Sequence, residues 1–471
     1  MSLVWFLFRT GLKPSRASYP CQRAAMANGY FWLATYVFSF IPIHREEIGS
    51  IRRKKFVAMV LVLMIIVAGV LWSLGLSKAP EKNVEVTLTG RLTAYRSASD
   101  IFVVRNTSGN DGGISELINL MGNEGLLFYK SSKASKNRGP TGLIASDDVI
   151  IVKVNSQWDE RGGTNTDLLK ALLESITNHP DGFTGEIIVA DNGQAQFGSS
   201  GAGGSLNWSR SNAEDHSQSV QKVVDAFSGS YKVSTYLWDT ITGKRVYEYD
   251  RNDMEDGYVV NSTINPRTGI MVSYPKFRTR FGTYVSFKLG VYDPQAHSYD
   301  GERLKVVNVP VFKSHSTYGV TACVKNYMGV LSDKLTRELG ARSHNTVGKG
   351  GMGTEMVETR FPVLNILDAI WVNAVPRAGP RTSYNSATRV NVIAASIDPV
   401  ALDYWAAKHI LVQVARSKGH SETAPIDPDN TDPGSFGNWL RLSMQEIKMR
   451  GYRTTTNEAE MNIYVTTLTH R

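Results

Sequence analysis

The sequence predicts an α/β fold built on a mainly parallel sheet, preceded by one transmembrane helix and interrupted by a β-rich insertion. Three patterns support this prediction. Short β-branched apolar runs at 149–154 and 186–190 are typical of buried parallel strands. Apolar residues recur at helical spacing over 162–178, between those runs. Residues 56–76 carry no charge. Strand, helix and strand in this order form a βαβ unit, so we expect a Rossmann-like sheet with helices on both faces.

Residues 56–76 are apolar and uncharged over 21 positions. A helix of this length spans roughly 30 Å, the thickness of the hydrocarbon core. Four basic residues precede it directly, at positions 52–55, and basic residues stay on the cytoplasmic side. The run is longer than the apolar part of a cleaved signal peptide, and no A-x-A site follows it. We therefore expect a single-pass signal anchor, with residues 1–55 in the cytoplasm and the C-terminal domain extracytoplasmic.

An earlier apolar stretch, Tyr30–Ile43, is aromatic but only 14 residues long. This is short for a membrane span. It either lies in the interface, with its aromatic rings among the headgroups, or forms a hairpin with 56–76 that places the N-terminus outside. The sequence leaves this choice open, together with the role of residues 1–50.

The net charge of +9 is concentrated near the predicted membrane segment. Residues 1–55 hold nine Lys or Arg and two acids, a balance of +7, which leaves +2 for the rest of the chain. A nucleic-acid-binding domain carries its basic excess on the folded part, so nucleic acid is not an expected partner. The two cysteines, Cys21 and Cys323, form no CxxC pair or cluster, and no iron–sulfur cluster is expected.

Beyond the anchor, residues 77–99 read as a linker and a first strand, and 100–471 as one α/β domain. Aromatic and polar residues alternate with turn signals over 231–292, which favours β-hairpins inserted into this domain. Two further apolar runs, Leu304–Val309 and Val390–Ala395, read as buried strands.

The first polar cluster follows the run at 149–154. Lys153 and Asn155 stand at the strand end, and Thr164 and Thr166 stand where the next helix begins. Free backbone N–H groups at a helix start, two hydroxyls and an ammonium suit an anion. The alternative is a polar turn in which a threonine caps the helix.

The second cluster follows the strand Leu304–Val309 and contains Lys313, His315, Thr321, Lys325 and Asn326. A histidine moves protons near neutral pH or ligates a metal, and a desolvated lysine binds an anion or acts as a nucleophile or base. A polar surface turn would have a similar composition.

The third cluster lies at Ser396–Asp403, where Asp398 precedes the proline that opens a helix. This geometry suits helix capping, and it also leaves room for a carboxylate that orients a catalytic group. A GxGxxG match at 348–353 follows no predicted strand, so we interpret it as a flexible loop and not as a dinucleotide site.

The three clusters together resemble the domain-of-unknown-function family 362. The resemblance runs through residues 100–415, and its most specific part is the pattern K-x-H-x5-T-x3-KN-x2-G from Lys313 to Gly329, followed by SIDPVALD from Ser396. Many members carry a cysteine-rich ferredoxin segment that this chain lacks, so the resemblance implies no electron transfer through a cluster.

The spacing from His315 to Lys325 is also similar to an element of the lactate racemases that carry a nickel-pincer nucleotide. In that family the equivalent lysine holds the cofactor. The likeness covers about fifteen residues. It implies a ligand pocket near these two side chains but neither nickel nor racemisation.

These observations lead to one functional hypothesis and one rival. In the first, the domain is an enzyme of unknown reaction for a small anionic substrate or cofactor. His315, Lys325 and Asp398 would be catalytic, as acid/base or metal ligand, ligand-fixing amine and orienting carboxylate. The ligand-binding residues would be Lys153, Asn155, Thr164, Thr166, Lys313, Thr321 and Asn326. The rival is a non-catalytic binding or assembly module of the cell envelope. The sequence identifies no cofactor and leaves a metal at His315 open.

Overall fold

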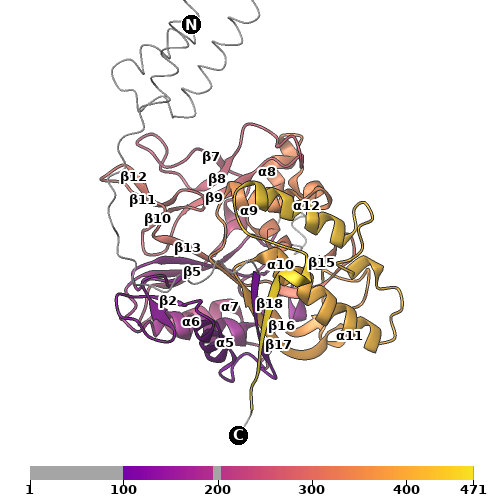
Figure 1. Cartoon of the computed structure of the whole chain (residues 1–471). Helices are drawn as coiled ribbons and strands as arrows, with labels where there is room; N and C mark the ends of the chain where they lie inside the picture. The colour runs from indigo at the N-terminus through magenta and orange to yellow at the C-terminus, as the bar shows by residue number, and fades with distance from the viewer. Residues whose placement is uncertain (1–98, 195–202, 470–471) are drawn as a thin grey trace, which may run out of the picture. The chain divides into compact units, whose positions relative to one another are not determined.

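The computed structural model describes residues 99–194 and 203–469 (Figure 1). The predicted anchor 56–76, the apolar stretch Tyr30–Ile43 and the linker up to residue 98 lie outside these residues. Among the residues described, none of the helices has both the length and the apolar character needed to cross a bilayer. The membrane anchor therefore stays a prediction.

The main sheet has ten strands in the described residues, in the order β18-β1-β17-β16-β13-β4-β5-β6, with β14 beside β16 and β15 beside β14. The strands are β1 (Ser99–Arg105), β4 (Val149–Lys153), β5 (Glu186–Asp191), β6 (Val233–Leu237), β13 (Leu304–Asn308), β14 (Val311–His315), β15 (Gly319–Thr321), β16 (Leu364–Asn373), β17 (Thr388–Ser396) and β18 (Met461–Thr467). Strands β16, β13, β4, β5 and β6 are parallel neighbours. Strand β17 runs antiparallel to β16 and β1. The predicted α/β class is confirmed.

The central strands are buried on both faces, which explains their unbroken apolar runs. Ile150 and Val152 belong to a core with α5 (Gly113–Asn123), α6 (Thr166–Thr177) and α7 (Val220–Phe227). Ile151 points to the opposite face, because side chains alternate along a strand. It belongs to a second core with α9 (Gly351–Glu358), α10 (Pro399–Ala406) and α12 (Phe436–Met449). Helices therefore cover both faces of the sheet (Figure 1).

A second sheet of six strands has the order β12-β11-β10-β9-β8-β7 in the described part of the chain. Its strands are β7 (Arg245–Val246), β8 (Gly257–Val260), β9 (Ser273–Arg278), β10 (Tyr284–Ser286), β11 (Gly290–Asp293) and β12 (Ser298–Asp300). The predicted β insertion at 231–292 began too early and ended too early. Strand β6 pairs in parallel with β5 and so belongs to the main sheet, and β12 extends the insertion to Asp300. A short pair, β2 (Tyr129–Lys130) and β3 (Arg138–Gly139), stands apart.

The glycine-rich segment 348–353 is not a flexible loop. Gly350 has a left-handed backbone and stands at the N-cap of α9, and Gly351 and Gly353 lie inside that helix. A Cβ atom on Gly353 would come within 2.4 Å of the Ser443 carbonyl oxygen in α12. The glycines therefore allow two helices to pack closely. The shorter helices α8 (Asp333–Glu338) and α11 (Val412–Ser417) complete the set of α-helices in the described residues.

Asp398 caps α10 and ties that helix to two distant segments. Its carboxylate, which is buried, accepts five hydrogen bonds of 2.6–3.1 Å, from the backbone N–H groups of Val400, Ala401 and Thr455 and from the hydroxyls of Ser99 and Thr454. These donors come from the start of β1, the first turn of α10 and the segment before β18. The aspartate therefore holds together the end of β17 and its surroundings.

We expect Asp398→Ala to lower the free energy of unfolding by roughly 2–4 kcal/mol, since it removes a helix cap and leaves buried donors without an acceptor. Chemical denaturation of the purified domain measures this change. Asp225→Ala, at an exposed position of α7, serves as the control and should stay within about 0.5 kcal/mol of wild type. A loss at Asp398 no larger than that of the control would contradict the assigned role.

Candidate functional site

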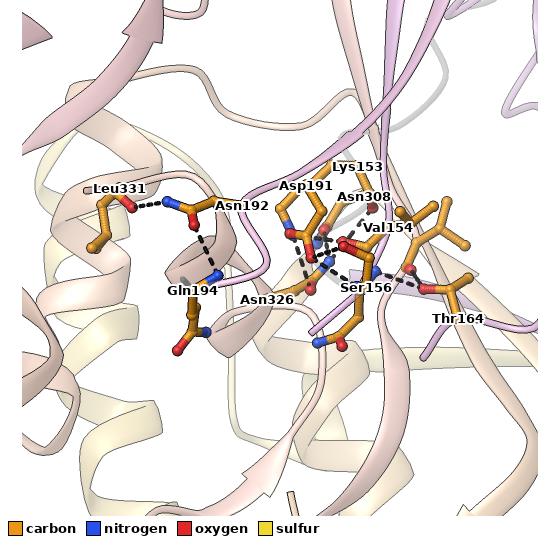
Figure 2. Close-up of polar contacts among 12 residues, drawn as sticks. Lys153, Val154, Ser156, Thr164, Asp191, Asn192, Gln194, Asn308, Asn326 and Leu331 are labelled. Atoms are coloured by element: carbon orange, nitrogen blue, oxygen red, sulfur yellow. Dashed lines mark hydrogen bonds and ion pairs between the residues drawn. The ribbon is translucent and has the colours of Figure 1, made fainter. Parts of the chain in front are cut away.

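A buried ion pair joins the carboxyl ends of the neighbouring strands β4 and β5 (Figure 2). The Lys153 Nζ lies 2.7 Å from Asp191 Oδ1, with both side chains almost fully buried. Lys153 Nζ also donates to the Val154 carbonyl at 2.7 Å and to Asn326 Oδ1 at 3.1 Å. Asp191 Oδ2 accepts from the backbone N–H and the hydroxyl of Ser156. Burial lowers the pKa of Lys153 and raises that of Asp191, while the attraction between the two charges opposes both shifts.

Three asparagine side chains extend this network along the strand ends. Asn326 Nδ2 donates to Asn308 Oδ1 at 2.8 Å, and Asn308 Nδ2 donates to Asn365 Oδ1 at 2.8 Å and to the Cys323 carbonyl at 3.0 Å. Asn308 closes β13 and Asn365 lies in β16, so the bonds attach the segment around Asn326 to two adjacent strands. The network holds the 3₁₀ turn Lys325–Gly329 in place.

Asp403, one turn into α10, supports the same turn from the other side. Its two oxygens accept from the backbone N–H groups of Cys323 and Val324 at 2.7 and 2.9 Å. Burial raises the pKa of this carboxyl to about 7. The two aspartates of the SIDPVALD segment therefore position backbone, Asp398 at the helix start and Asp403 at the approach to Lys325.

Only glycine fits at position 329, beside the ion pair. A Cβ atom at this position would lie 2.1 Å from Asp191 Oδ1 and 2.6 Å from Lys153 Nζ. Its carbonyl accepts from the Asn192 backbone N–H at 2.9 Å, which attaches the turn to the chain beyond β5. The glycine at the end of the KN-x2-G pattern is thus explained by the packing of the ion pair.

A small cavity opens next to this network. Its walls come from the ends of β4 and β5, from the β14–β15 hairpin and from the 3₁₀ turn. The lining residues are Asn155, Gln157, Asp191, Asn192, Gln194, Lys313, Thr321, Lys325, Asn326, Met328, Gly329 and Pro380. Five of the predicted site residues thus meet at one cavity: Asn155, Lys313, Thr321, Lys325 and Asn326.

The β14–β15 hairpin presents Lys313 and Thr321 to this cavity. The two residues face each other across the hairpin, and His315 faces Gly319 two positions further. Lys313 Nζ donates to the Gly162 carbonyl at 2.5 Å. Burial lowers the pKa of Lys313 well below its ordinary value, and the charge of Lys325 lowers it further.

Lys325 is buried, and its Nζ lies 5.6 Å from the centre of the Tyr318 ring. In residues 99–194 and 203–469 neither this lysine nor Lys313 forms an ion pair with a carboxylate. Burial lowers the pKa of Lys325 to about 7. Its amine is therefore divided between the charged and the neutral form near neutral pH.

His315 does not line the cavity. Its Nδ1 accepts from the backbone N–H groups of Thr317 and Tyr318 at 3.1 and 3.2 Å, which closes the turn of the hairpin and leaves the proton on Nε2. Burial lowers the pKa of His315 strongly, and the charge of Lys325 adds to this, so the ring stays neutral at physiological pH. The expected proton shuttle at this position thus has no geometric support. The described residues contain no group of three or more His, Cys, Asp or Glu that could hold a metal ion.

The threonines at the start of α6 are also occupied by structural bonds. Thr164 Oγ1 donates to the Val309 carbonyl, and Thr166 Oγ1 donates to that of Gln218. The cap of α6 is Asn165, whose Oδ1 accepts from two backbone N–H groups, so the expected anion position at this helix start is filled by the protein itself. Thr164 and Thr166 line a second small cavity, which shares Asn155 with the first.

The predicted site residues therefore fall into two groups: those that line the cavity and those that have structural roles. The lysines of the KSHSTYGVTACVKN segment reach one cavity, Lys153 lies beneath it in an ion pair, and Asp398 is absent from its walls and serves as a cap. The sequence interpretation missed Asp191, which follows the apolar run at 186–190 directly. An acid at that strand end, beside the lysine at the end of β4, was the available signal.

We expect Gly329→Ala to separate Lys153 from Asp191 and to destabilise the domain by roughly 3–5 kcal/mol, the range for breaking a buried ion pair. Thermal and denaturant unfolding measure this. Gly229→Ala is the matched control, because a Cβ atom there meets nothing within 4 Å. Equal stability of the two variants would show that the ion pair does not constrain the turn.

Comparison with protein families found a match, and it covers the segment that contains these lysines. Searches of curated proteins and of solved structures found no match. The likeness to nickel-pincer lactate racemases is not shown. Residues 302–408 match the family described as "Domain of unknown function (DUF362)". This range includes β13, the β14–β15 hairpin, the 3₁₀ turn with Lys325, and the DPVALD segment. The matched segment of the chain is thus DUF362-like, and it carries both cavity lysines.

Proposed function

We propose that this chain is a membrane-anchored, extracytoplasmic enzyme whose domain binds a small anionic substrate or cofactor beside Lys313 and Lys325. One contrast within the fold carries this proposal. Two other fully buried lysines have carboxylate partners, Lys153 with Asp191 at 2.7 Å and Lys276 with Asp253 at 2.8 Å. The two cavity lysines have none among the described residues. A buried ammonium without a counter-ion is costly, and a bound anion removes this cost.

The other cavity groups suit a small polar ligand. Thr321 Oγ1 and Asn155 Oδ1 are buried and have no hydrogen-bonding partner in the described residues. The first donates or accepts and the second accepts, so together with an ammonium they match a carboxylate or phosphate that carries a further hydroxyl.

The ion pair beneath the cavity contributes position and no net charge. Because Lys153 and Asp191 neutralise each other, Lys313 and Lys325 are the basic groups of the cavity wall that have no carboxylate partner among the described residues. The asparagine network and Gly329 fix the turn that carries Lys325, which supports a ligand geometry set in advance of binding. This preorganisation favours an enzyme over a protein that only binds an anion.

The proposal of a membrane anchor rests on the sequence alone. The uncharged run 56–76 and the basic residues at 52–55 support a single span with the DUF362-like domain outside the cytoplasm. A tethered domain of near-neutral charge would meet solutes of the extracytoplasmic space and not nucleic acid.

We expect oxamate, pyruvate, phosphate or sulfate to stabilise the protein against heat. A ligand at 100 times its Kd adds about 2.7 kcal/mol to the free energy of unfolding. In Lys313→Met the affinity should fall about tenfold, equal to about 1.4 kcal/mol, and in Lys325→Met it should also fall. Binding should weaken as the pH rises through about 7, because Lys325 then loses its proton.

Calorimetric titration and thermal shift at pH 6 and pH 8.5 measure these effects. Lys232→Met, at an exposed position, is the control and should bind as wild type does. The proposal is wrong if no anion in the set stabilises the wild-type protein, or if both cavity variants respond as the control does.

The tether predicts that Ile65→Arg with Ile66→Arg moves the full-length protein from the membrane fraction to the soluble fraction. Each arginine near the middle of a span costs about 2.5–3.5 kcal/mol of insertion free energy. Sedimentation after alkaline carbonate washing detects the change. The leucine substitutions at the same positions should leave the protein in the membrane. A C-terminal alkaline phosphatase fusion tests the orientation, and an inactive fusion would exclude an extracytoplasmic domain.

A further inference from the structure

Strand β18 (Met461–Thr467) forms one end of the main sheet, and within the described residues it pairs only with β1 (Figure 1). The Leu468 N–H donates to the Arg105 carbonyl of β1. Backbone groups alternate in direction along a strand, so the N–H and C=O groups of Ile463 and Val465 point away from β1. In the part of the chain that the structure describes, no other strand or turn bonds to these groups. The outer edge of β18 therefore offers a row of backbone donors and acceptors to a further strand.

This edge lacks the features that usually keep an edge strand from pairing. The strand reads MNIYVTT, with no charged residue and no proline, and its register with β1 is regular over all seven residues. Lysine, proline and bulges are the common protections of an edge strand. Ile463 and Val465 are 37% and 46% exposed, and they lie on one face of the strand because they are two positions apart. On the opposite face Tyr464 stacks on Phe102, with ring centres 5.4 Å apart.

The sequence of β18 is complementary to itself in an antiparallel pair. Tyr464 is the middle residue of the strand, so a two-fold axis at this position pairs all seven residues with those of a second copy. Ile463 then lies opposite the partner's Val465, and Asn462 lies opposite the partner's Thr466. Because Ile463 and Val465 both direct their backbone groups outward, each of these pairs exchanges two hydrogen bonds. The two apolar pairs lie on the same face and form one cluster of four side chains.

We propose that two copies of this chain associate through the outer edges of their β18 strands, which joins the two main sheets into one. The symmetry of the interface is a two-fold axis, the commonest arrangement in homo-oligomers. This inference is independent of the anion site, since it concerns a different surface. It accounts for an uncharged strand with two exposed apolar side chains at the end of a sheet whose other parallel strands are buried.

Light scattering during size-exclusion chromatography of the full-length protein in mild detergent tests the proposal. We expect the protein part of the particle to have twice the chain mass of 52.0 kDa. Val465→Lys places an ammonium opposite Ile463 in both pairs and should raise the dissociation constant of the dimer about tenfold or more. Ile264→Lys is the matched control, because it removes another exposed apolar side chain, 49% exposed, from a segment outside β18. It should dimerise as wild type does, and both variants should keep the thermal stability of the wild-type domain.

A charge exchange tests the register. Ile463→Lys and Val465→Glu should each weaken the dimer alone, whereas the two substitutions in one chain set an ammonium opposite a carboxylate in both pairs and should restore it. A monomeric wild type would overturn the inference and would favour another segment, such as the strand predicted within 77–99, as the occupant of this edge. A Val465→Lys protein that dimerises as wild type does, or a double variant no stronger than the single ones, would also overturn it.

Discussion

The ion pair between Lys153 and Asp191 sets the geometry on which the candidate site depends. Both groups are removed from water at the ends of adjacent strands, so each needs the other, and Ser156 and Asn326 satisfy their remaining hydrogen bonds. The pair in turn requires a residue without a side chain beside it, which Gly329 provides. A charge pair in the sheet thus determines where the turn that begins with Lys325 runs.

The two cavity lysines differ from the other buried lysines in having no carboxylate partner among the described residues. Lys153 and Lys276 show that this fold stabilises a buried ammonium with an aspartate. Lys313 has a backbone carbonyl and distant carboxylates, and Lys325 has an aromatic face. The same desolvation that makes these two groups costly lowers both pKa values, that of Lys325 to about 7 and that of Lys313 well below its ordinary value.

Most of the polar residues that surround these lysines in sequence have structural tasks. Asp398 caps α10, Asp403 holds the backbone at Cys323 and Val324, and His315 closes the hairpin turn. A motif that is dense in polar residues therefore contains two lysines without carboxylate partners in the described residues, together with the scaffold that positions them. The residue types alone do not separate the two groups, because a buried carboxylate that accepts backbone N–H groups has the same composition as one aimed at a ligand.

The sequence by itself determined the α/β class, the strand ends at which polar groups gather, and the segment with Lys313 and Lys325, because these follow from local apolar periodicity and from residue spacing. Tertiary structure decided which polar groups face one another. Strand β6 joined the main sheet, Asp398 turned to Ser99 and Thr454, and Asp191 met Lys153, through contacts between residues far apart in the chain. Such contacts depend on the packing of the whole domain, and a local pattern carries no information about them.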